Sequence, residues 1–291
     1  MLRLISVSLA AISLAACATT DGAAPAPRFD GAALDAVLEA QPADVQERYA
    51  SRHPRETIEF FEIAPGETVV DTLPGEVWYS GILASYLGAG GKVIGADYSP
   101  SMWALFGAFA DAEFLEKKKT WAADWIAGAP KWAPASVAEI GAFAYGAVPD
   151  DLKGTVDTVL LVRAMHHFNR FEEEGGFRTA ALADIMAMLK PGGIVGVVQH
   201  RAPEANSDKW AEGDNGYLKQ SQQIAAFEAA GFEFLGSSEI NANPADQPTE
   251  ADRVWRLPPT LGGVRNNPEL KAQMEAIGES DRMTLKFRKP E

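Results

Sequence analysis

Cysteine is nearly absent from this chain, since Cys17 is the single one among 291 residues. No disulfide can form within the chain, so the fold depends on its hydrophobic core. Positive charge is also scarce: 26 lysines and arginines stand against 40 aspartates and glutamates, a formal net charge of −14 at pH 7. An acidic surface repels phosphate backbones, and the composition therefore argues against a nucleic-acid partner.

Three chemical signatures are missing as well. The chain has no G-x-S-x-G sequence, which argues against a serine hydrolase. Its first strand-to-helix turn has no G-x-G-x-x-G sequence, which argues against a nicotinamide dinucleotide. Four histidines are present, but none is spaced as H-x-x-x-H or E-x-x-H, and we predict no metal site.

The apolar run at the N-terminus is too short to span a membrane. It covers residues 4–16 after Arg3, whereas a transmembrane helix needs roughly 20 apolar residues. One cation followed by a short apolar run is typical of a secretory signal. The run ends in Leu14-Ala15-Ala16-Cys17, which resembles the lipobox of bacterial lipoproteins. A signal peptide without lipidation and a buried cysteine in an uncleaved segment are the alternatives.

The lipobox resemblance implies a lipid on Cys17 after cleavage of a signal peptide at residues 1–16. The membrane is therefore an expected partner, through that lipid. Residue 18 is alanine rather than aspartate, which by analogy with the sorting rule of lipoproteins implies the periplasmic face of the outer membrane. Residues 17–30 are small, polar and contain proline, so we expect a flexible tether between the lipid and the folded domain.

Two regions follow the tether. Residues 31–64 have a helical pattern and are expected to form an N-terminal helical cover. From residue 65 to 291, short β-branched runs alternate with helical stretches, which predicts an α/β domain with a mostly parallel, seven-stranded sheet and helices on both faces. The expected strands are 67–71, 93–97, one within 137–147, 156–162, 194–198, 232–235 and 283–287.

The helices expected between these strands have recognisable ends. Ser99 precedes Pro100 and is predicted to cap a long helical region that runs to about Trp125. The segment 128–136 is rich in proline, glycine and alanine, which predicts a loop. The stretch 177–189 is amphipathic, and the Lys-Pro-Gly-Gly turn that follows it is expected to stop the helix.

Acidic residues end the first two predicted strands. Asp71 and the Pro74-Gly75 turn follow the first strand, and Asp97 and Tyr98 follow the second. Ligands of open parallel sheets lie at the carboxyl ends of the strands, near the point where the strand order reverses. A carboxylate at the position of Asp97 can accept hydrogen bonds from both hydroxyls of a ribose. That arrangement suits either a nicotinamide dinucleotide or S-adenosylmethionine.

Several short motifs follow one another from about Ala50 to the C-terminus: Arg52-His53-Pro54, Pro65-Gly66, Pro74-Gly75 with Trp78-Tyr79, Ile82-Leu83, His200-Arg201, Ala230-Gly231-Phe232, Asn243-Pro244-Ala245-Asp246 and Leu285-Lys286-Phe287-Arg288-Lys289-Pro290. In this order and spacing they resemble a group of bacterial predicted methyltransferases. The resemblance implies a Rossmann-like class I methyltransferase fold and S-adenosylmethionine as the cofactor, without implying a methyl acceptor. With the strand ends above, it implies these cofactor-binding residues: Asp71, Pro74, Gly75, Glu76, Val77, Asp97 and Tyr98.

The turn after the first strand departs from that family. The family has P-G-G-G-W-Y, and this chain has Glu76 and Val77 at the second and third of those glycines. Glycine there lets the backbone approach the cofactor and take positive φ, which a β-branched residue resists. We expect a shifted turn in which Val77 has ordinary β-region dihedral angles and partly fills the pocket, so that the cofactor binds weakly. The alternative is an unshifted turn on which the cofactor lies slightly higher.

Histidines provide the candidate catalytic groups. His166 and His167 follow the fourth predicted strand, and His200 ends the fifth, so all three are expected at the same rim of the sheet. Histidine suits acid–base chemistry near neutral pH. A capping or surface role for each of them is the alternative.

The sequence therefore predicts an S-adenosylmethionine-dependent methyltransferase that acts on a small molecule. The alternative is a degenerate lipoprotein that uses the fold as a binding module without catalysis. Export favours this alternative, because adenosylmethionine is made in the cytoplasm. The identity of the acceptor and the oligomeric state stay open.

Overall fold

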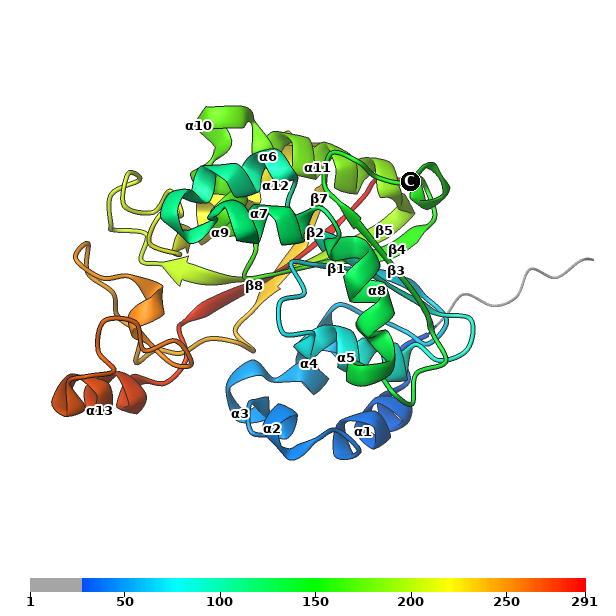
Figure 1. Ribbon diagram of the computed structural model, residues 1–291, viewed down its shortest axis with the longest axis horizontal. Coiled ribbons are helices and arrows are strands. Elements are labelled where there is room, and N and C mark those ends of the chain that lie inside the picture. The colour runs from blue at the N-terminus through cyan, green and yellow to red at the C-terminus, as the bar shows by residue number, and fades with distance from the viewer. Residues whose placement is uncertain (1–27) are drawn as a thin grey trace, which may run out of the picture.

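The computed structural model of the protein describes residues 28–291 (Figure 1). Cys17, the signal peptide and most of the predicted tether lie outside the described residues, so those predictions stay predictions. Within residues 28–291, no helix is both long enough and apolar enough to cross a membrane.

A twisted, mostly parallel sheet forms the centre of the protein, as predicted. It has eight strands, seven of them in the order β3-β2-β1-β4-β5-β8-β7, while the short β6 pairs with β5. β8 runs antiparallel to both β5 and β7, and the other pairs are parallel. The strands are β1 (Thr68–Thr72), β2 (Lys92–Asp97), β3 (Glu139–Ala144), β4 (Val156–Val162), β5 (Leu189–Ala202), β6 (Leu218–Lys219), β7 (Glu233–Ser238) and β8 (Arg282–Arg288).

Helices cover both faces of the sheet, and each face has its own apolar cluster (Figure 1). One cluster joins the sheet to α1 (Gly31–Glu39), α4 (Pro54–Phe60), α5 (Trp78–Tyr86) and α8 (Trp121–Trp132). The other joins it to α6 (Pro100–Trp103), α9 (Met165–Arg170), α11 (Phe177–Met188) and α12 (Gln220–Ala229). The remaining helices are α2 (Ala43–Gln46), α3 (Tyr49–Arg52), α7 (Ala112–Lys118), α10 (Glu172–Gly175) and α13 (Pro268–Ile277), with short 3-10 turns at Ala104–Phe109, Asp150–Leu152 and Val254–Arg256.

The region between Ser99 and β3 differs from its prediction. Ser99 does cap a helix, because its side chain accepts the Met102 N–H at 3.2 Å. The helix does not continue to Trp125, since the chain breaks at Gly107, where φ is +60°. The loop predicted for 128–136 was wrong in its first half, because α8 continues to Trp132. Its aromatic side chains pack on the sheet and on one another, which overrides the helix-breaking residues.

The amphipathic helix expected at 177–189 is α11, and it ends at Met188. The Lys190–Gly193 segment is not a separate turn, because it lies inside the long strand β5. A register shift between β4 and β5 at Val156–Thr158 accommodates the extra residues. The helix therefore passes directly into the strand.

Candidate active site at the carboxyl edge of the sheet

The turn after β1 is built from strained backbone. Leu73 has φ +53°, Gly75 +56° and Val77 +59°, and Val77 is the residue before α5. The expectation of ordinary β-region angles at Val77 was wrong. A left-handed residue with a side chain costs roughly 1–2 kcal/mol, so the surrounding structure must enforce this conformation. The turn thus keeps a backbone that glycine would adopt without strain.

Glu76 and Val77 have different surroundings. Glu76 is exposed, and Val77 packs against the apolar cluster that includes α1 and α5. Both line a pocket of about 900 Å³ between the N-terminal helices, the start of α5 and the end of α8. Pro74 is half-buried and Gly75 is exposed. The Glu76 carboxylate therefore points into solvent rather than into the protein.

Asp71, a predicted cofactor-binding residue, is buried near the end of β1. Its carboxylate accepts the Ser80 hydroxyl at 2.6 Å, which ties β1 to the first turns of α5. Burial raises the pKa of Asp71 to about 6, against the opposing effects of the Ser80 hydrogen bonds and of Arg163. Asp71 positions the turn through Ser80.

Asp97 ends β2 and is already paired. One of its oxygens accepts the Tyr98 N–H at 2.9 Å, and the other contacts Lys118 Nζ at 2.7 Å. Burial raises the pKa of Asp97, and the charge of Lys118 opposes this effect. Lys118 comes from α7 and also lies 4.1 Å from the centre of the Trp103 ring. A ribose at Asp97 would have to share this carboxylate with Lys118.

Tyr98 joins the ends of β2 and β4. It is buried, and its hydroxyl donates to the Ala164 carbonyl at 2.8 Å. The same hydroxyl lies 3.2 Å from His167 Nδ1. Its ring packs edge-on against Phe168. Within the described part of the chain, Tyr98 thus orients His167 and the start of α9.

The three candidate histidines lie together, as the sequence predicted. The ring centres of His166 and His167 are 3.9 Å apart, and those of His166 and His200 are 5.7 Å apart. His166 Nδ1 lies 3.3 Å from the Gln199 side-chain oxygen, whose amide nitrogen donates to Gly216. This pattern assigns the proton to Nδ1, so Nε2 holds the lone pair. Nε2 is buried, and it has no partner among the described residues.

All three histidines are neutral at physiological pH. Burial lowers the pKa of His166 to about 4. Burial also lowers the pKa values of His167 and His200 far below the ordinary range, and His166 adds to the effect in both cases. His200 Nδ1 lies 2.6 Å from the Ser280 hydroxyl. His166 Nε2 can therefore accept a hydrogen bond from a ligand, and the catalytic role of the three histidines stays a prediction.

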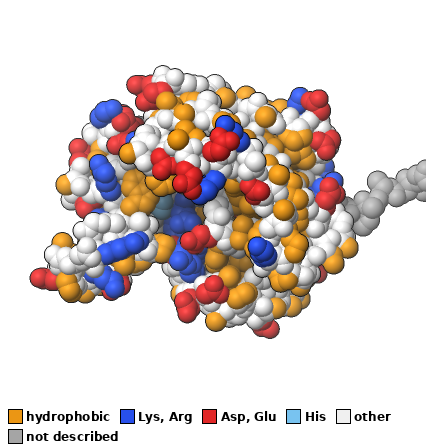
Figure 2. All heavy atoms as spheres, in the orientation of Figure 1, with side chains coloured by type: hydrophobic (Ala, Val, Ile, Leu, Met, Phe, Trp, Pro, Cys, Tyr) orange, Lys and Arg blue, Asp and Glu red, His pale blue; other side chains and the backbone are white. Residues whose placement is uncertain are grey.

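Four arginines form a group next to this site: Arg163 and Arg282, whose charges act on the pKa of His200, and Arg48 and Arg52, which share a carboxylate with Arg282. Arg52, Arg48 and Arg282 all contact one carboxylate, that of Glu279, at 3.3, 3.7 and 3.1 Å. Figure 2 shows a hollow on this face with lysine or arginine and histidine side chains in its floor, in the region where Figure 1 has the start of β8 between α9 and α3. We call this set of four residues the arginine cleft.

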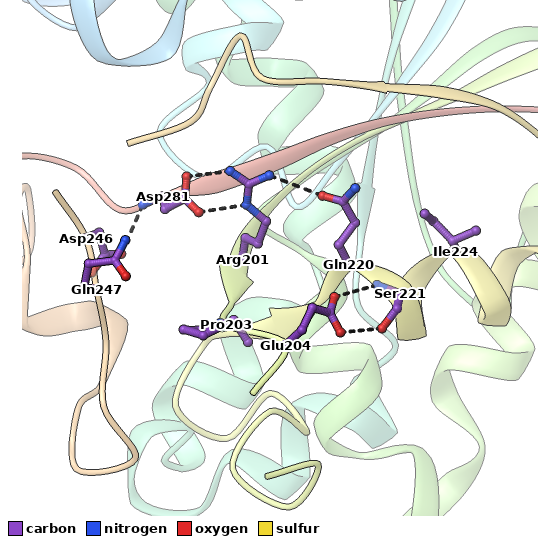
Figure 3. A pocket seen from close by; sticks show the side chains of 10 residues that line it. Arg201, Pro203, Glu204, Gln220, Ser221, Ile224, Asp246, Gln247 and Asp281 are labelled. Atoms are coloured by element: carbon purple, nitrogen blue, oxygen red, sulfur yellow. Dashed lines mark hydrogen bonds and ion pairs between the residues drawn. The ribbon is translucent and has the colours of Figure 1, made fainter. Parts of the chain in front are cut away.

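A second cavity lies on the other side of β5, and its one arginine, Arg201, is paired with carboxylates (Figure 3). It has a volume of about 640 Å³. Arg201 contacts Asp281 at 2.8 Å and Glu239 at 2.7 Å, and Asp246 accepts the Asp281 N–H at 3.0 Å. This network holds the residues just before β8, and with them Glu279 and Ser280, against the end of β5.

Metal ligands are not gathered anywhere in the part of the chain that the structure describes. No group of three or more histidine, cysteine, aspartate or glutamate side chains in residues 28–291 is placed to hold a metal ion.

Comparison with known proteins supports the fold. No protein-family model and no curated protein matches the sequence. The structure of the 4+2 cyclase SpnF is similar with a TM-score of 0.51 and 17% identity, over 83% of this chain and 81% of that one. CrArsM, an arsenic(III) S-adenosylmethionine methyltransferase from Chlamydomonas reinhardtii, has a TM-score of 0.47 and 16% identity, over 89% and 73%. A SAM-dependent methyltransferase from Aquifex aeolicus has 0.45 and 16%, over 74% and 94%.

The similarity to the SpnF structure and the strand order of the sheet indicate the same fold. A sheet in the order β3-β2-β1-β4-β5-β8-β7 with one antiparallel strand at β8, covered on both faces, matches the predicted architecture. The chain has the Rossmann-like class I methyltransferase fold.

Proposed function

We propose that this protein binds S-adenosylmethionine at the carboxyl ends of β1 and β2 and transfers its methyl group to a small molecule. The residues that would hold the cofactor are those of the Asp71–Val77 turn and Asp97. When bound, adenosylmethionine supplies an electrophilic methyl group on a sulfonium. His166 lies across the site after β4, with a buried lone pair on Nε2 that can accept the proton the acceptor loses.

The single observation that carries this proposal is the conformation of the turn after β1. Leu73 and Val77 keep positive φ although both carry side chains. Strain of this kind persists where the rest of the structure enforces it, and it gathers at functional sites. Val77 packs against an apolar cluster and Glu76 is exposed, which supports a turn that still has room for a ligand.

One observation favours a second candidate, a binding module without methyl transfer. Lys118 occupies the Asp97 oxygen that a ribose would use. An ion pair that is mostly buried costs free energy to break. If it does not open, the fold keeps its cleft but cannot hold the adenosyl group.

Equilibrium dialysis with labelled adenosylmethionine separates the two candidates. Lys118→Met removes the competitor of the ribose, and we expect it to strengthen binding about tenfold, the scale of one charge-assisted hydrogen bond. Asp97→Ala should weaken binding by about 1–3 kcal/mol. Lys117→Met is the matched control, because Lys117 is exposed and pairs only with Glu113 on the same helix. No binding by wild type and by Lys118→Met would favour the binding module.

We also propose that the protein is anchored to the membrane by a lipid on Cys17, at the periplasmic face of the outer membrane. The support is the apolar run before Leu14-Ala15-Ala16-Cys17 and the alanine at residue 18. Labelled palmitate should enter wild type and not Cys17→Ala. Equal labelling of both would show that Cys17 is not the lipid site.

A further inference from the structure

The arginine cleft has more positive charge than its own residues balance. Arg282 and Arg52 are buried, and together with Arg48 they share the single carboxylate of Glu279. Glu279 can accept in ion pairs through two oxygens, so three guanidinium groups compete for them. Arg282 completes its hydrogen bonds with the carbonyls of Ser51 and Ser280.

Arg163 adds a fourth positive charge without any partner of its own. It follows β4 directly, is half-buried, and its side chain has no hydrogen bond or ion pair within residues 28–291. Its backbone is left-handed, with φ +56°, and its N–H donates to the Val198 carbonyl at 2.7 Å. A strained residue thus places an unpaired guanidinium group at the edge of the sheet.

The electrostatics of the cleft show that the arginines affect one another. Burial lowers the pKa of Arg163, and the charge of Arg282 lowers it further. Burial, followed by the charge of Arg163, lowers the pKa of Arg52 to about 10. Arginine stays protonated in proteins, so these shifts express the cost of holding positive charges close together. An anion between them would remove that cost.

Arg282 lies away from the strands that would hold the cofactor, whereas Arg163 follows β4, the neighbour of β1, and its charge opposes the rise in the pKa of Asp71. The sheet order runs β2-β1-β4-β5-β8, and Arg282 is on β8, three strands from β1. At about 4.8 Å between neighbouring strands, this places Arg282 roughly 14 Å from β1 along the sheet. Arg282 is directly opposite His200 in the antiparallel β5–β8 pair, so both side chains belong to the same face. The arginine cleft therefore adjoins the histidines.

We propose that the arginine cleft binds the oxyanion of an organic acid, a carboxylate or a phosphate, and that Arg163 is its anchor, with Arg282 adding positive charge beside it. A planar guanidinium group offers two parallel N–H donors to such an anion, which suits its recognition. Calling this acid the methyl acceptor rests on the proposed function; the anion site itself does not. The acceptor would then lie with its acid group on the arginines and its body against His166 and Trp255, whose ring centres are 6.0 Å apart.

Calorimetric titration of the purified protein tests the site without the cofactor. The probes are benzoate and phenylphosphonate, with benzamide as the neutral control of the same shape as benzoate. We expect saturable binding of at least one anion and none of benzamide. Arg163→Met should weaken anion binding by at least about tenfold. Failure of both anions to bind the wild type, or unchanged binding by Arg163→Met, would overturn the proposal.

Arg288→Met is the matched control variant. Arg288 is at the other end of β8 and pairs with Glu233, far from the cleft. We expect it to bind the anions as wild type does. An equal loss in both variants would contradict a specific site and point to a general effect of charge.

A second titration separates the acceptor's anion from the carboxylate of the cofactor itself. Adenosylmethionine and 5′-methylthioadenosine, which lacks that carboxylate, are titrated into wild type and Arg163→Met. We expect Arg163→Met to bind each of them as wild type does, and benzoate to bind alongside them. Competition by benzoate, with loss of adenosylmethionine binding alone in Arg163→Met, would overturn the assignment. If wild type binds no adenosylmethionine, the proposed function fails, while the anion titration still decides the site.

Discussion

Arg201 and Arg163 lie at the ends of neighbouring strands and have opposite surroundings. Arg201 contacts Asp281 and Glu239, and these hydrogen bonds raise its pKa above the ordinary range. Arg163 has no partner among the described residues, and burial lowers its pKa. Asp281 also accepts the Asn243 N–H at 2.8 Å, so the Arg201 side of β5 forms a connected network, of which Figure 3 shows the Arg201–Asp281 pair.

The difference separates structural charge from functional charge. In the Arg201 network each buried charge meets opposite charge, which fixes the segment before β8. In the arginine cleft three guanidinium groups contact one carboxylate, that of Glu279, and Arg163 has no such contact among the described residues. This imbalance persists beside three neutral histidines. Perturbed charges in a cleft are typical of sites that bind or transform a ligand. Substitutions in the two regions should therefore change the free energy of unfolding in opposite directions.

The largest expected effect comes from breaking the paired side at Asp246. This carboxylate is buried and contacts Arg256 at 3.0 Å and the Tyr217 hydroxyl at 2.9 Å. Asp246→Ala leaves the Asp281 N–H without its acceptor and leaves Arg256 with one carboxylate, that of Asp252, instead of two. We expect the free energy of unfolding to fall by about 3 kcal/mol, the usual cost of removing one partner of a buried pair. Urea denaturation measures it, and a loss below about 1 kcal/mol would show that the network does not stabilise the fold.

The second prediction concerns pH and the histidines of the cleft. The pKa of His166 is about 4 in the folded protein, below the ordinary 6.5. Its contribution to stability is therefore complete above pH 6.5 and is lost as the pH falls from there toward 4. Between about pH 7.5 and 4.5, wild type should lose about 2 kcal/mol more than His166→Gln. Parallel stability curves for the two proteins would mean that His166 is not held neutral by the fold.

The smallest expected effects come from the same substitution, arginine to methionine, made once in the arginine cleft and once in the Arg201 network. Arg163→Met removes an unpaired charge, and we expect the free energy of unfolding without ligand to rise by about 1 kcal/mol. Arg201→Met should instead lower it by about 1 kcal/mol, because Asp281 and Glu239 lose their partner. Thermal and urea unfolding of both variants measure whether the free energy of unfolding rises or falls in each. A loss of stability in Arg163→Met would contradict the view that this charge is kept for a ligand.

The sequence predicts the strands well where local composition decides them. The β-branched run at Val156–Val162 is a strand with the predicted bounds, and Asp71 and Asp97 lie at the ends of β1 and β2 as expected. The three histidines meet because the carboxyl ends of parallel strands share one edge. Each of these follows from local pattern and simple topology.

The remaining features depend on contacts between distant segments. Arg52 and Glu279 are 227 positions apart, and their pairing needs the segment after β7 to fold back onto α3. Lys118 reaches Asp97 because the helical region breaks at Gly107, which the sequence did not reveal. Val77 was expected to follow its intrinsic preference, and the surrounding structure overrides that preference. The Arg52-His53-Pro54 motif includes one arginine of the cleft, but the motif alone does not reveal that Arg52 pairs with Glu279.

Calorimetric titration of the wild-type protein with S-adenosylmethionine tests the central claim most directly. We expect saturable binding at one site per chain, because the turn after β1 keeps its strained conformation and Asp97 is in place. Binding should strengthen in Lys118→Met, as the ion pair with Asp97 no longer has to open. Absence of binding in both proteins, with both still folded, would contradict the account and leave the fold as a module for another ligand.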